Sequence, residues 1–471
     1  MVPGVMGLTS CCRSLSAEPA VLLYSFVMFL YAAGIPNLIQ QKVCSPESPP
    51  PVSFVCNDTA LLAEATDIVT IRATLKQGLP AIILLLAGFV RDLTGLNNPI
   101  MYFALFWEIV GICIQIFAYL VWTSSPWTTS ITEGVINGLG GGSSLFFVGA
   151  TCAITDNTEH EERTTRLTLI FASVSFGACL AYGVSGYCLT YMGYKWFLIF
   201  TIGLQLSTGI LVMIFVKDKK KKEKNGGTSE ILNQLKSAFK RRPNTTIIWF
   251  MIFASCSITV ISLAEVNIYQ YYLQQTFGYT IEDVGLYIAY RLIVGCIGSI
   301  IIPPIVEKLL KWSDFKIGIM CSLVTAISSF SMVFATTTLE IKIFALLDIT
   351  KMILFGLPIS IISKCVKEDE LGMFVSFCLI GESILPFVIF SLYDYIYTNT
   401  SKTLPGAFYL ASASVLTVLL IFYSTSACMS TPCEIDDKDI RNVSENLENC
   451  EKVSELRETS SLDCESDKSV K

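Results

Sequence analysis

The stretch Gly88-Phe-Val-Arg-Asp-Leu-Thr-Gly95 has the pattern G-x-x-x-D-x-x-G and ends a mostly apolar run that begins at Val69. Asn97-Asn98-Pro99 separates it from the next apolar run. Glycine allows two helix ends to approach closely, and an aspartate in such a turn can accept hydrogen bonds from the exposed amides of a neighbouring helix N-terminus. We therefore predict a short polar turn between two membrane helices, in which Gly88, Asp92 and Gly95 form a conformational latch.

The composition around this turn is that of a membrane protein. Of the 471 residues, 52% are hydrophobic and only 15% are charged, and the mean hydropathy is +0.59. Soluble domains carry about 25% charged residues. The first eighteen residues lack a basic segment followed by a short apolar stretch and a cleavage site. We therefore expect the first apolar run to be an uncleaved transmembrane anchor.

Twelve apolar runs are long enough to cross the roughly 30 Å of hydrocarbon in a bilayer. They predict an all-α membrane protein with twelve transmembrane helices in two six-helix bundles. The runs lie at 20–40, 69–90, 100–122, 131–155, 166–189, 195–216, 246–272, 283–306, 316–338, 341–363, 371–396 and 404–426.

The distribution of lysine and arginine predicts the orientation of these helices. The loop between the sixth and seventh runs carries ten Lys or Arg residues between Lys217 and Arg242, and basic loops favour the cytoplasmic side. Both termini should then be cytoplasmic, in a multi-pass protein of the plasma membrane or of endosomal or lysosomal membranes. The predicted parts are a cytoplasmic N-terminus (1–19), a first bundle (20–216), a basic linker (217–245), a second bundle (246–426) and a disordered acidic tail (427–471).

The predicted outer loop at 41–68 contains features of an extracytoplasmic segment. Cys44 and Cys56 share this polar loop and can form a disulfide on the oxidising side of a membrane. The loop also holds a glycosylation sequon at Asn57, and a second predicted outer sequon lies at Asn399.

Charged residues inside the apolar runs are the strongest indication of function, because each is costly unless it faces an aqueous cavity or a partner. Asp348 and Lys351 are three residues apart and can pair on one helix face. Tyr269 follows Glu265 by four residues, with Tyr272 one turn further, as a polar and aromatic stripe would. The charged residues are Lys76, Glu108 and Glu133 in the first half and Glu265, Arg291, Asp348, Lys351 and Glu382 in the second.

We assign roles to these residues by their charge. Burial favours the neutral form of a carboxylic acid, so Glu265, Asp348, Glu382 and Glu108 are the candidates for proton coupling. The candidates for binding an anionic solute are Arg291, Lys351, Lys76, Tyr269 and Tyr272. The alternative is an internal network of ion pairs that only holds the bundles together.

Several motifs resemble the major facilitator superfamily and, within it, solute carrier family 46, the proton-coupled folate transporter-like family. They are the Gly88–Gly95 turn, Thr155-Asp156 followed by Arg163-Thr-Thr-Arg166, and the segment from Ser363 to Ser376. The resemblance covers most of residues 18–426 and implies proton-coupled import of organic anions of the folate-like, muropeptide or cyclic dinucleotide class.

The sequence departs from the folate branch at its functional positions. The acidic residue of that branch on the fourth helix falls at Gly142, its glutamate on the fifth at Phe171, and its arginine on the tenth at Ile359. Its histidine on the seventh helix is absent, and only the turn aspartate, Asp92, carries over. These departures leave folate, and the proton site of that branch, without support from the sequence.

We predict a secondary active transporter that works by alternating access around a midplane cavity. The expected partners are a small anionic solute and the lipid bilayer, with the proton as coupling ion and a monomer as a plausible state. We expect no cofactor, metal ion or nucleic acid. An enzyme is disfavoured because the single histidine, His160, cannot build a nucleophile-and-base set within the membrane. The alternative from another class is a non-transporting receptor or scaffold that retains the fold.

Overall fold

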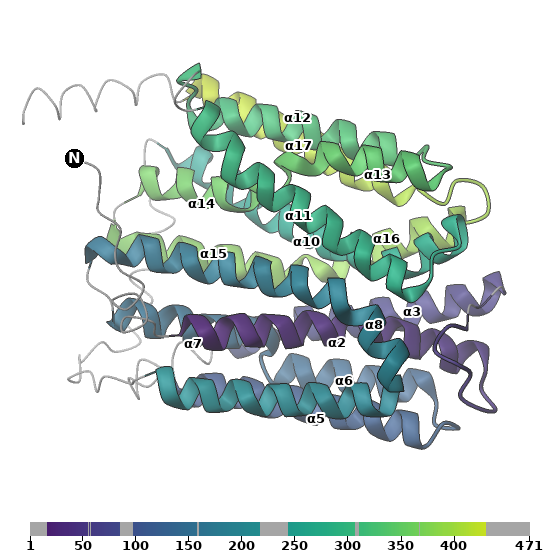
Figure 1. Cartoon of the computed structure of the whole chain (residues 1–471). Helices are drawn as coiled ribbons and strands as arrows, with labels where there is room; N and C mark the ends of the chain where they lie inside the picture. Colours follow the sequence, from purple (N-terminus) through teal and green to yellow (C-terminus); the bar gives the residue numbers. More distant parts are fainter. Residues whose placement is uncertain are drawn as a thin grey trace, which may run out of the picture.

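The computed structural model describes residues 17–54, 56, 58–84, 98–157, 160–216, 244–306, 310–366 and 368–429. Within these ranges the chain folds into helices and contains no strand (Figure 1). The predicted latch at Gly88, Asp92 and Gly95 lies outside the described residues. So do most of the basic linker and nearly all of the acidic tail, and the domain boundaries therefore stay predictions.

The helices form two groups that follow the order of the chain. Helices α2–α8 pack mainly against one another, as do α10–α17, and Figure 1 shows the two groups as the purple-to-teal and green-to-yellow parts. The N-terminal helices are α2 (Glu18–Cys44), α3 (Thr59–Gly78), α5 (Asn98–Leu120), α6 (Pro126–Leu139), α7 (Gly142–Asn157) and α8 (His160–Phe215). The C-terminal ones are α10 (Thr245–Phe277), α11 (Ile281–Ile305), α12 (Asp314–Met332), α13 (Thr338–Leu346), the 3₁₀ helix η2 (Leu347–Thr350), α14 (Ile353–Cys365), α15 (Glu368–Ile384), α16 (Pro386–Thr400) and α17 (Phe408–Met429).

Three of the predicted helices are interrupted. Gly141 adopts φ +81°, a conformation that glycine tolerates, and it separates α6 from α7. Pro386 begins α16 directly after α15, and the η2 segment separates α13 from α14. Interruptions of this kind are tolerated at membrane depth where neighbouring helices or cavities satisfy the freed backbone groups.

The described residues contain ten candidate membrane spans, and the count of twelve stays a prediction. Ten segments are long and apolar enough to span a membrane, and one of them, Ala172–Phe215, has 44 residues with a non-helical glycine at Gly193. At about 1.5 Å per residue this segment is long enough for two crossings. Helix α3 is not among the ten because it carries charged residues, and it begins at Thr59 rather than near 69. Its charged face is turned inward, which a search for apolar runs does not detect.

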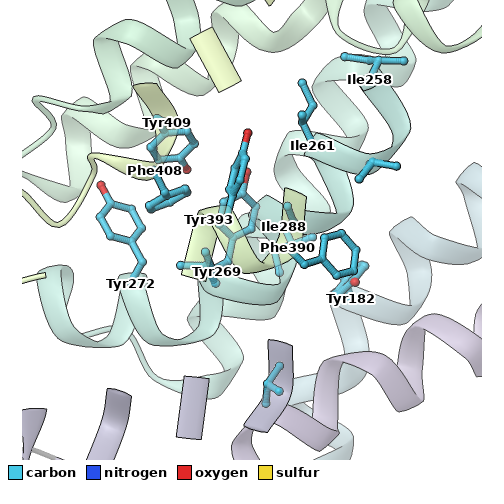
Figure 2. Close-up of a cluster of buried hydrophobic side chains, with 14 of the residues drawn as sticks. Tyr182, Ile258, Ile261, Tyr269, Tyr272, Ile288, Phe390, Tyr393, Phe408 and Tyr409 are labelled. Atoms are coloured by element: carbon cyan, nitrogen blue, oxygen red, sulfur yellow. The ribbon is translucent and has the colours of Figure 1, made fainter. Parts of the chain in front are cut away.

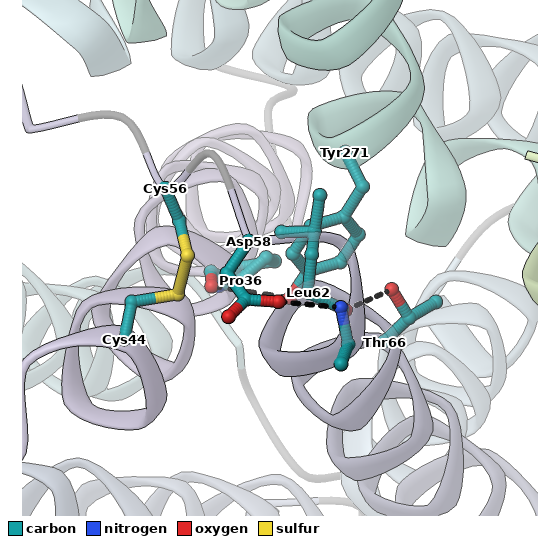
Figure 3. Close-up of a disulfide and its surroundings, with 8 residues drawn as sticks. Pro36, Cys44, Cys56, Asp58, Leu62, Thr66 and Tyr271 are labelled. Carbon is teal, nitrogen blue, oxygen red and sulfur yellow. Dashed lines mark hydrogen bonds between the residues drawn. A yellow bond between two sulfur atoms is a disulfide. The ribbon is translucent and has the colours of Figure 1, made fainter. Parts of the chain in front are cut away.

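The two groups are in contact along the helix pairs α8–α11 and α3–α16. Hydrogen bonds between the groups are described at the end that carries the bond between Cys44 and Cys56 (S–S 2.00 Å), which we call the disulfide end. There the Tyr271 hydroxyl of α10 donates to the carbonyl oxygens of Pro36 (3.3 Å) and Ala65 (3.4 Å), close to the disulfide loop (Figure 3). Beside it, Gln270 donates to Asn37 (3.4 Å). This set of bonds, which we call the disulfide-end lock, joins α10 to α2 and α3.

We expect Tyr271→Phe to favour the conformation in which the disulfide end opens, because the variant removes the one O–H that two carbonyl oxygens of the other group share. At about 0.5–1.5 kcal/mol for this hydrogen bond, the open population should rise about twofold to tenfold. The rate at which a membrane-impermeant thiol reagent modifies a cysteine placed at Ala33 measures that population. Tyr397→Phe is the matched control, since the Tyr397 hydroxyl donates to Gln275 within the C-terminal group (2.7 Å). Equal rates in both variants would contradict the assignment of the lock.

Candidate functional site

Four charged side chains meet inside the C-terminal group. Arg291 of α11 pairs with Asp348 of η2 through Nε (2.9 Å) and Nη2, and its Nη2 also lies 3.6 Å from Glu265 of α10. Lys351 Nζ donates to Glu265 Oε2 (2.8 Å). These four residues, which we call the four-charge cluster, contain two cations and two carboxylates, so the cluster is neutral when all four are charged.

Hydroxyl groups also bind the carboxylates of the cluster. Ser328 donates to Asp348 Oδ1 (2.6 Å), Ser412 donates to Glu265 Oε1 (2.6 Å), and Tyr269 donates to Glu265 Oε2 (2.7 Å). The expected stripe of Glu265 and Tyr269 on one face of α10 is therefore present. Each carboxylate is solvated by the protein, as a buried charge requires.

The predicted pair of Asp348 and Lys351 is wrong. Asp348 lies in η2 and bonds to Arg291, whereas Lys351 follows η2 and bonds to Glu265. The spacing rule assumes a regular α-helix with no competing partners. Here a 3₁₀ segment changes the relative directions of the two side chains, and each finds an opposite charge on another helix.

Tyrosine side chains contribute to the surroundings of the cluster, and Figure 2 shows three of them, Tyr269, Tyr272 and Tyr409, among the buried hydrophobic side chains of the C-terminal group. The guanidinium of Arg291 lies 5.0 Å from the centre of the Tyr269 ring and 6.0 Å from that of Tyr287, both within cation–π range. The side chains of Tyr272, Tyr287 and Tyr409 are 0%, 3% and 0% exposed.

Four hydrogen-bond donors around the four-charge cluster have no acceptor. The hydroxyls of Tyr272, Tyr287 and Tyr409 and the Nη1 of Arg291 have no hydrogen-bond partner within the described part of the chain. Buried donors are rarely left unpaired, because each costs about 1–3 kcal/mol. The site therefore offers four unused donors to a ligand that is rich in acceptor oxygens.

Glu382, on α15, lies apart from the four-charge cluster. Its Oε1 accepts a hydrogen bond from Thr259 of α10 (3.1 Å), and it forms no ion pair with any described residue. The structure thus separates the predicted carboxylates of this half. Glu265 and Asp348 share one cluster, whereas Glu382 is a single half-buried group two residues before the end of its helix.

A second ion pair lies in the N-terminal group between Arg72 of α3 and Glu133 of α6. Two guanidinium nitrogens bond to the carboxylate, one of them Nη2 at 2.9 Å. Glu133 also accepts from Tyr31 (3.2 Å) and Asn137 (2.5 Å), and it is fully buried. Four hydrogen bonds from the protein thus bind this carboxylate.

Lys76 and Glu108 lie beside this pair without joining it. Glu108 accepts from Tyr24 (2.6 Å) and Gln205, while the Lys76 ammonium lies 5.3 Å from the Tyr31 ring and forms no hydrogen bond or ion pair with a described residue. Lys76 and Glu108 line the same small pocket of the N-terminal group. They are therefore not brought to the four-charge cluster.

The two groups repeat one arrangement. In each, a tyrosine on the first helix (Tyr31 or Tyr269) lies under an arginine of the second (Arg72 or Arg291). The arginine in turn pairs with a carboxylate of the fourth, interrupted helix. The copies differ at the arginine. Arg291 Nη1 and the hydroxyls of three neighbouring tyrosines have no partner among the described residues, whereas no buried nitrogen of Arg72 is unpaired.

Some of these residues had been missed from the sequence. Arg72 precedes Lys76 by four residues in a predicted helix, which was a usable signal, because i and i+4 share a face. Tyr287 and Tyr409 carried none, since tyrosines in apolar runs also occur at lipid-facing positions. The sequon at Asn57 lies outside the described residues, while Asn399 is exposed in the last turn of α16, and its glycosylation stays a prediction.

We compared the sequence and the fold of the chain with those of known proteins. A model described as Major Facilitator Superfamily matches residues 19–389, while no curated protein matches the sequence. A D-xylose-proton symporter is 13% identical with a TM-score of 0.65, covering 86% of this chain and 95% of that one. The POT family transporter PepTSo is 10% identical with a TM-score of 0.63, covering 87% and 97%. The fucose:proton symporter FucP of E. coli is 15% identical with a TM-score of 0.54, covering 87% and 98%.

These structures show the fold alone, given their low identity. The family model, by contrast, matches the sequence itself over most of its 471 residues. The chain therefore belongs to the Major Facilitator Superfamily, whose family and fold are those of membrane transporters rather than of enzymes.

Proposed function

We propose that this protein is a proton-coupled transporter of a small organic anion, of the solute carrier family 46 type, that binds the anion at the four-charge cluster. The observation that supports this most directly is the set of unused donors on Arg291, Tyr272, Tyr287 and Tyr409. Donors in such number match the oxygens of a carboxylate, phosphate or sulfate group. Two of the structurally similar proteins are described as proton symporters, which makes proton coupling a natural candidate here.

Charge balance links the anion to the proton. The cluster is neutral with Glu265 and Asp348 ionised, so a bound monoanion would leave a net negative charge in a low-dielectric site. A proton on one carboxylate restores neutrality and frees its cation for the anion. Glu265 is the better acceptor, because protonation there releases Lys351, whereas Asp348 is held by two nitrogens of Arg291.

Alternating access then follows from the two groups rocking about the cluster. In the present conformation the disulfide-end lock joins the groups. The anion and the proton would enter together when the lock opens and leave at the opposite end. At that end Asp92 would act as the latch. Entry from outside requires the orientation that the basic linker predicts.

We expect Glu265→Gln to uncouple anion movement from the proton, because the amide resembles the protonated acid and cannot release a proton. Uptake of a radiolabelled organic-anion panel into vesicles should rise at acidic pH in the wild type. In the variant, uptake should be equal at acidic and neutral pH, while exchange of internal for external anion persists.

The matched control is Glu47→Gln, which neutralises an exposed carboxylate in the loop that follows α2. It should keep the acid stimulation. Stimulation that survives in a triple variant with Glu265→Gln, Asp348→Asn and Glu382→Gln would contradict proton coupling by these carboxylates. Failure of every anion in the panel to enter wild-type vesicles would contradict the transport assignment itself.

A further inference from the structure

Two aspartates from different groups of helices meet toward the disulfide end. Helices α3 and α16 lie side by side (Figure 1). Asp67 of α3 and Asp394 of α16 are in hydrogen-bonding contact, and the Thr70 hydroxyl of α3 donates to Asp394. Neither aspartate forms an ion pair with a described residue. The contact between the two groups therefore brings together two carboxyl groups without a cation.

The two helices pack closely along this contact. Gly78 of α3 has no space for a β-carbon, because the ring of Phe387 of α16 lies against it. Thr70 is only 4% exposed, and Asp394 Oδ1 is buried without a hydrogen-bond partner among the described residues. Little water can therefore reach the carboxyl groups while the helices stay together, and the pair has too few donors for two ionised carboxylates.

The carboxyl pair adjoins the disulfide-end lock. Asp67 follows Ala65 by two residues, and the carbonyl oxygen of Ala65 accepts from Tyr271 of α10. The Tyr271 hydroxyl is also within electrostatic range of Asp394. The lock and the carboxyl pair thus both join the C-terminal group to α3, and we expect them to form and break together.

The other helices around Asp394 bring no cation to the pair. The cations of α3, Arg72 and Lys76, face the ion pair and the pocket of the N-terminal group. Helix α10 presents the neutral hydroxyl of Tyr271. Helix α17 and the rest of α16 contain no charged residue, and the described carboxylate of α15, Glu382, bonds to α10. The charge of the two aspartates can therefore be reduced only by a ligand.

A proton is the ligand that fits this contact. Two carboxylates in contact cannot both be ionised, so they share one proton, which forms a hydrogen bond between them. A calcium ion would need six or more oxygen ligands. Within the described ranges no group of three His, Cys, Asp or Glu residues could hold a metal ion.

We propose that Asp67 and Asp394 share one proton in the closed conformation and that this proton holds the disulfide end shut. Opening separates α3 from α16, and each carboxyl group then meets water and ionises. The closed conformation thus binds one proton more than the open one, so acid favours closure and alkaline pH favours opening. This gating proton goes beyond the one proposed at Glu265, because it depends on the position of two helices and not on a bound anion.

The test measures how far the disulfide end is open, in the full chain in membrane vesicles and without any solute. A membrane-impermeant thiol reagent is applied to the chain with Ala33→Cys at a series of pH values. Each rate is divided by that of the chain with Glu47→Cys, an exposed position, which corrects for ionisation of the thiol itself. The ratio should rise from acidic to alkaline pH, by at most about tenfold per pH unit for one proton.

Two variants in this reporter chain replace the shared proton by an amide. In Asp394→Asn, and separately in Asp67→Asn, the amide donates to the remaining carboxylate at every pH. Both variants should lose the pH response and react as slowly at alkaline pH as the unmodified pair does at acidic pH. Glu64→Gln is the matched control on α3, because Glu64 accepts from Trp127 within the N-terminal group (2.9 Å). It should keep the pH response.

The outcomes separate this inference from the proposed function. A ratio that does not change with pH, or a response that survives in both aspartate variants, would overturn the gating proton. So would a ratio that follows Na⁺ or Ca²⁺ at constant pH instead, because a bridging cation would then hold the pair. Glu265→Gln should keep the response. Loss of the response in Glu265→Gln, with retention in Asp394→Asn, would overturn the inference and leave proton coupling at Glu265 standing. Failure of anion uptake would contradict the proposed function alone, since no solute is present in this measurement.

Discussion

Arg291→Gln is expected to reduce anion uptake at least about a hundredfold, the largest functional effect among the variants considered. The guanidinium holds Asp348, contacts Glu265 and keeps one nitrogen unpaired within the site. Its loss leaves two carboxylates with only Lys351 as a cation and removes a donor for the solute. Breaking a buried ion pair costs about 3–5 kcal/mol, so surface expression should fall as well.

A double variant distinguishes the two consequences. Arg291→Gln combined with Asp348→Asn removes both partners, so no buried charge is left unpaired, and expression should return close to the wild-type level. Uptake should stay low, because the cation that meets the anion is still missing. Vesicle uptake per molecule of protein at the surface measures this difference. Lys364→Gln, which breaks an exposed pair with Asp314, is the control and should change neither property much.

Recovery of uptake in the double variant would show that Arg291 and Asp348 serve only to stabilise the bundle. That is the alternative raised by the sequence, in which the buried charges hold helices together. The double variant thus decides between the two interpretations of the intramembrane charges.

The fold could be predicted from the sequence because lipid imposes a strong and local constraint. A crossing helix needs about twenty apolar residues, and such runs are visible without tertiary information. The prediction weakened where a helix turns polar residues inward. The sequence predicts helix α3 only from residue 69, because Glu64 and Asp67 interrupt the apolar residues before it, although the helix begins at Thr59.

The candidate site could be predicted only in its charged members. Glu265, Arg291, Asp348 and Lys351 were visible because charges are rare in apolar runs. Their pairing was not visible, since it depends on which helices are neighbours, and spacing alone gave the wrong partner for Asp348. The unused hydroxyls of Tyr287 and Tyr409 were beyond prediction, because a tyrosine has the same sequence signature whether it faces lipid or a polar site.

Arg72 and Glu133 form the N-terminal copy of the repeated arrangement. For this pair we expect a role in stability and not in uptake, the opposite of the expectation for Arg291 and Asp348. Glu133 is fully buried and accepts from Arg72, Tyr31 and Asn137, so the pair with Arg72 is enclosed by the protein. Glu133→Gln should leave Arg72 as an uncompensated charge and destabilise the protein by about 3–5 kcal/mol. The lower midpoint of thermal unfolding in detergent measures this loss.

Removing the charges of both Arg72 and Glu133 should restore stability. It should also restore uptake, which removal of both charges of the C-terminal pair should not. Arg72→Gln with Glu133→Gln leaves two amides that can still bond to each other and to Asn137, and the four-charge cluster is untouched. We expect uptake within a few-fold of wild type, because replacing a complete buried pair by neutral groups is often close to neutral for stability. Uptake as low as in the Arg291 and Asp348 double variant would mean that the N-terminal copy also meets the solute. We expect otherwise because the two arginines differ. Arg291 keeps one nitrogen unpaired beside three unpaired tyrosine hydroxyls, which indicates a binding site, whereas no buried nitrogen of Arg72 is left for a solute.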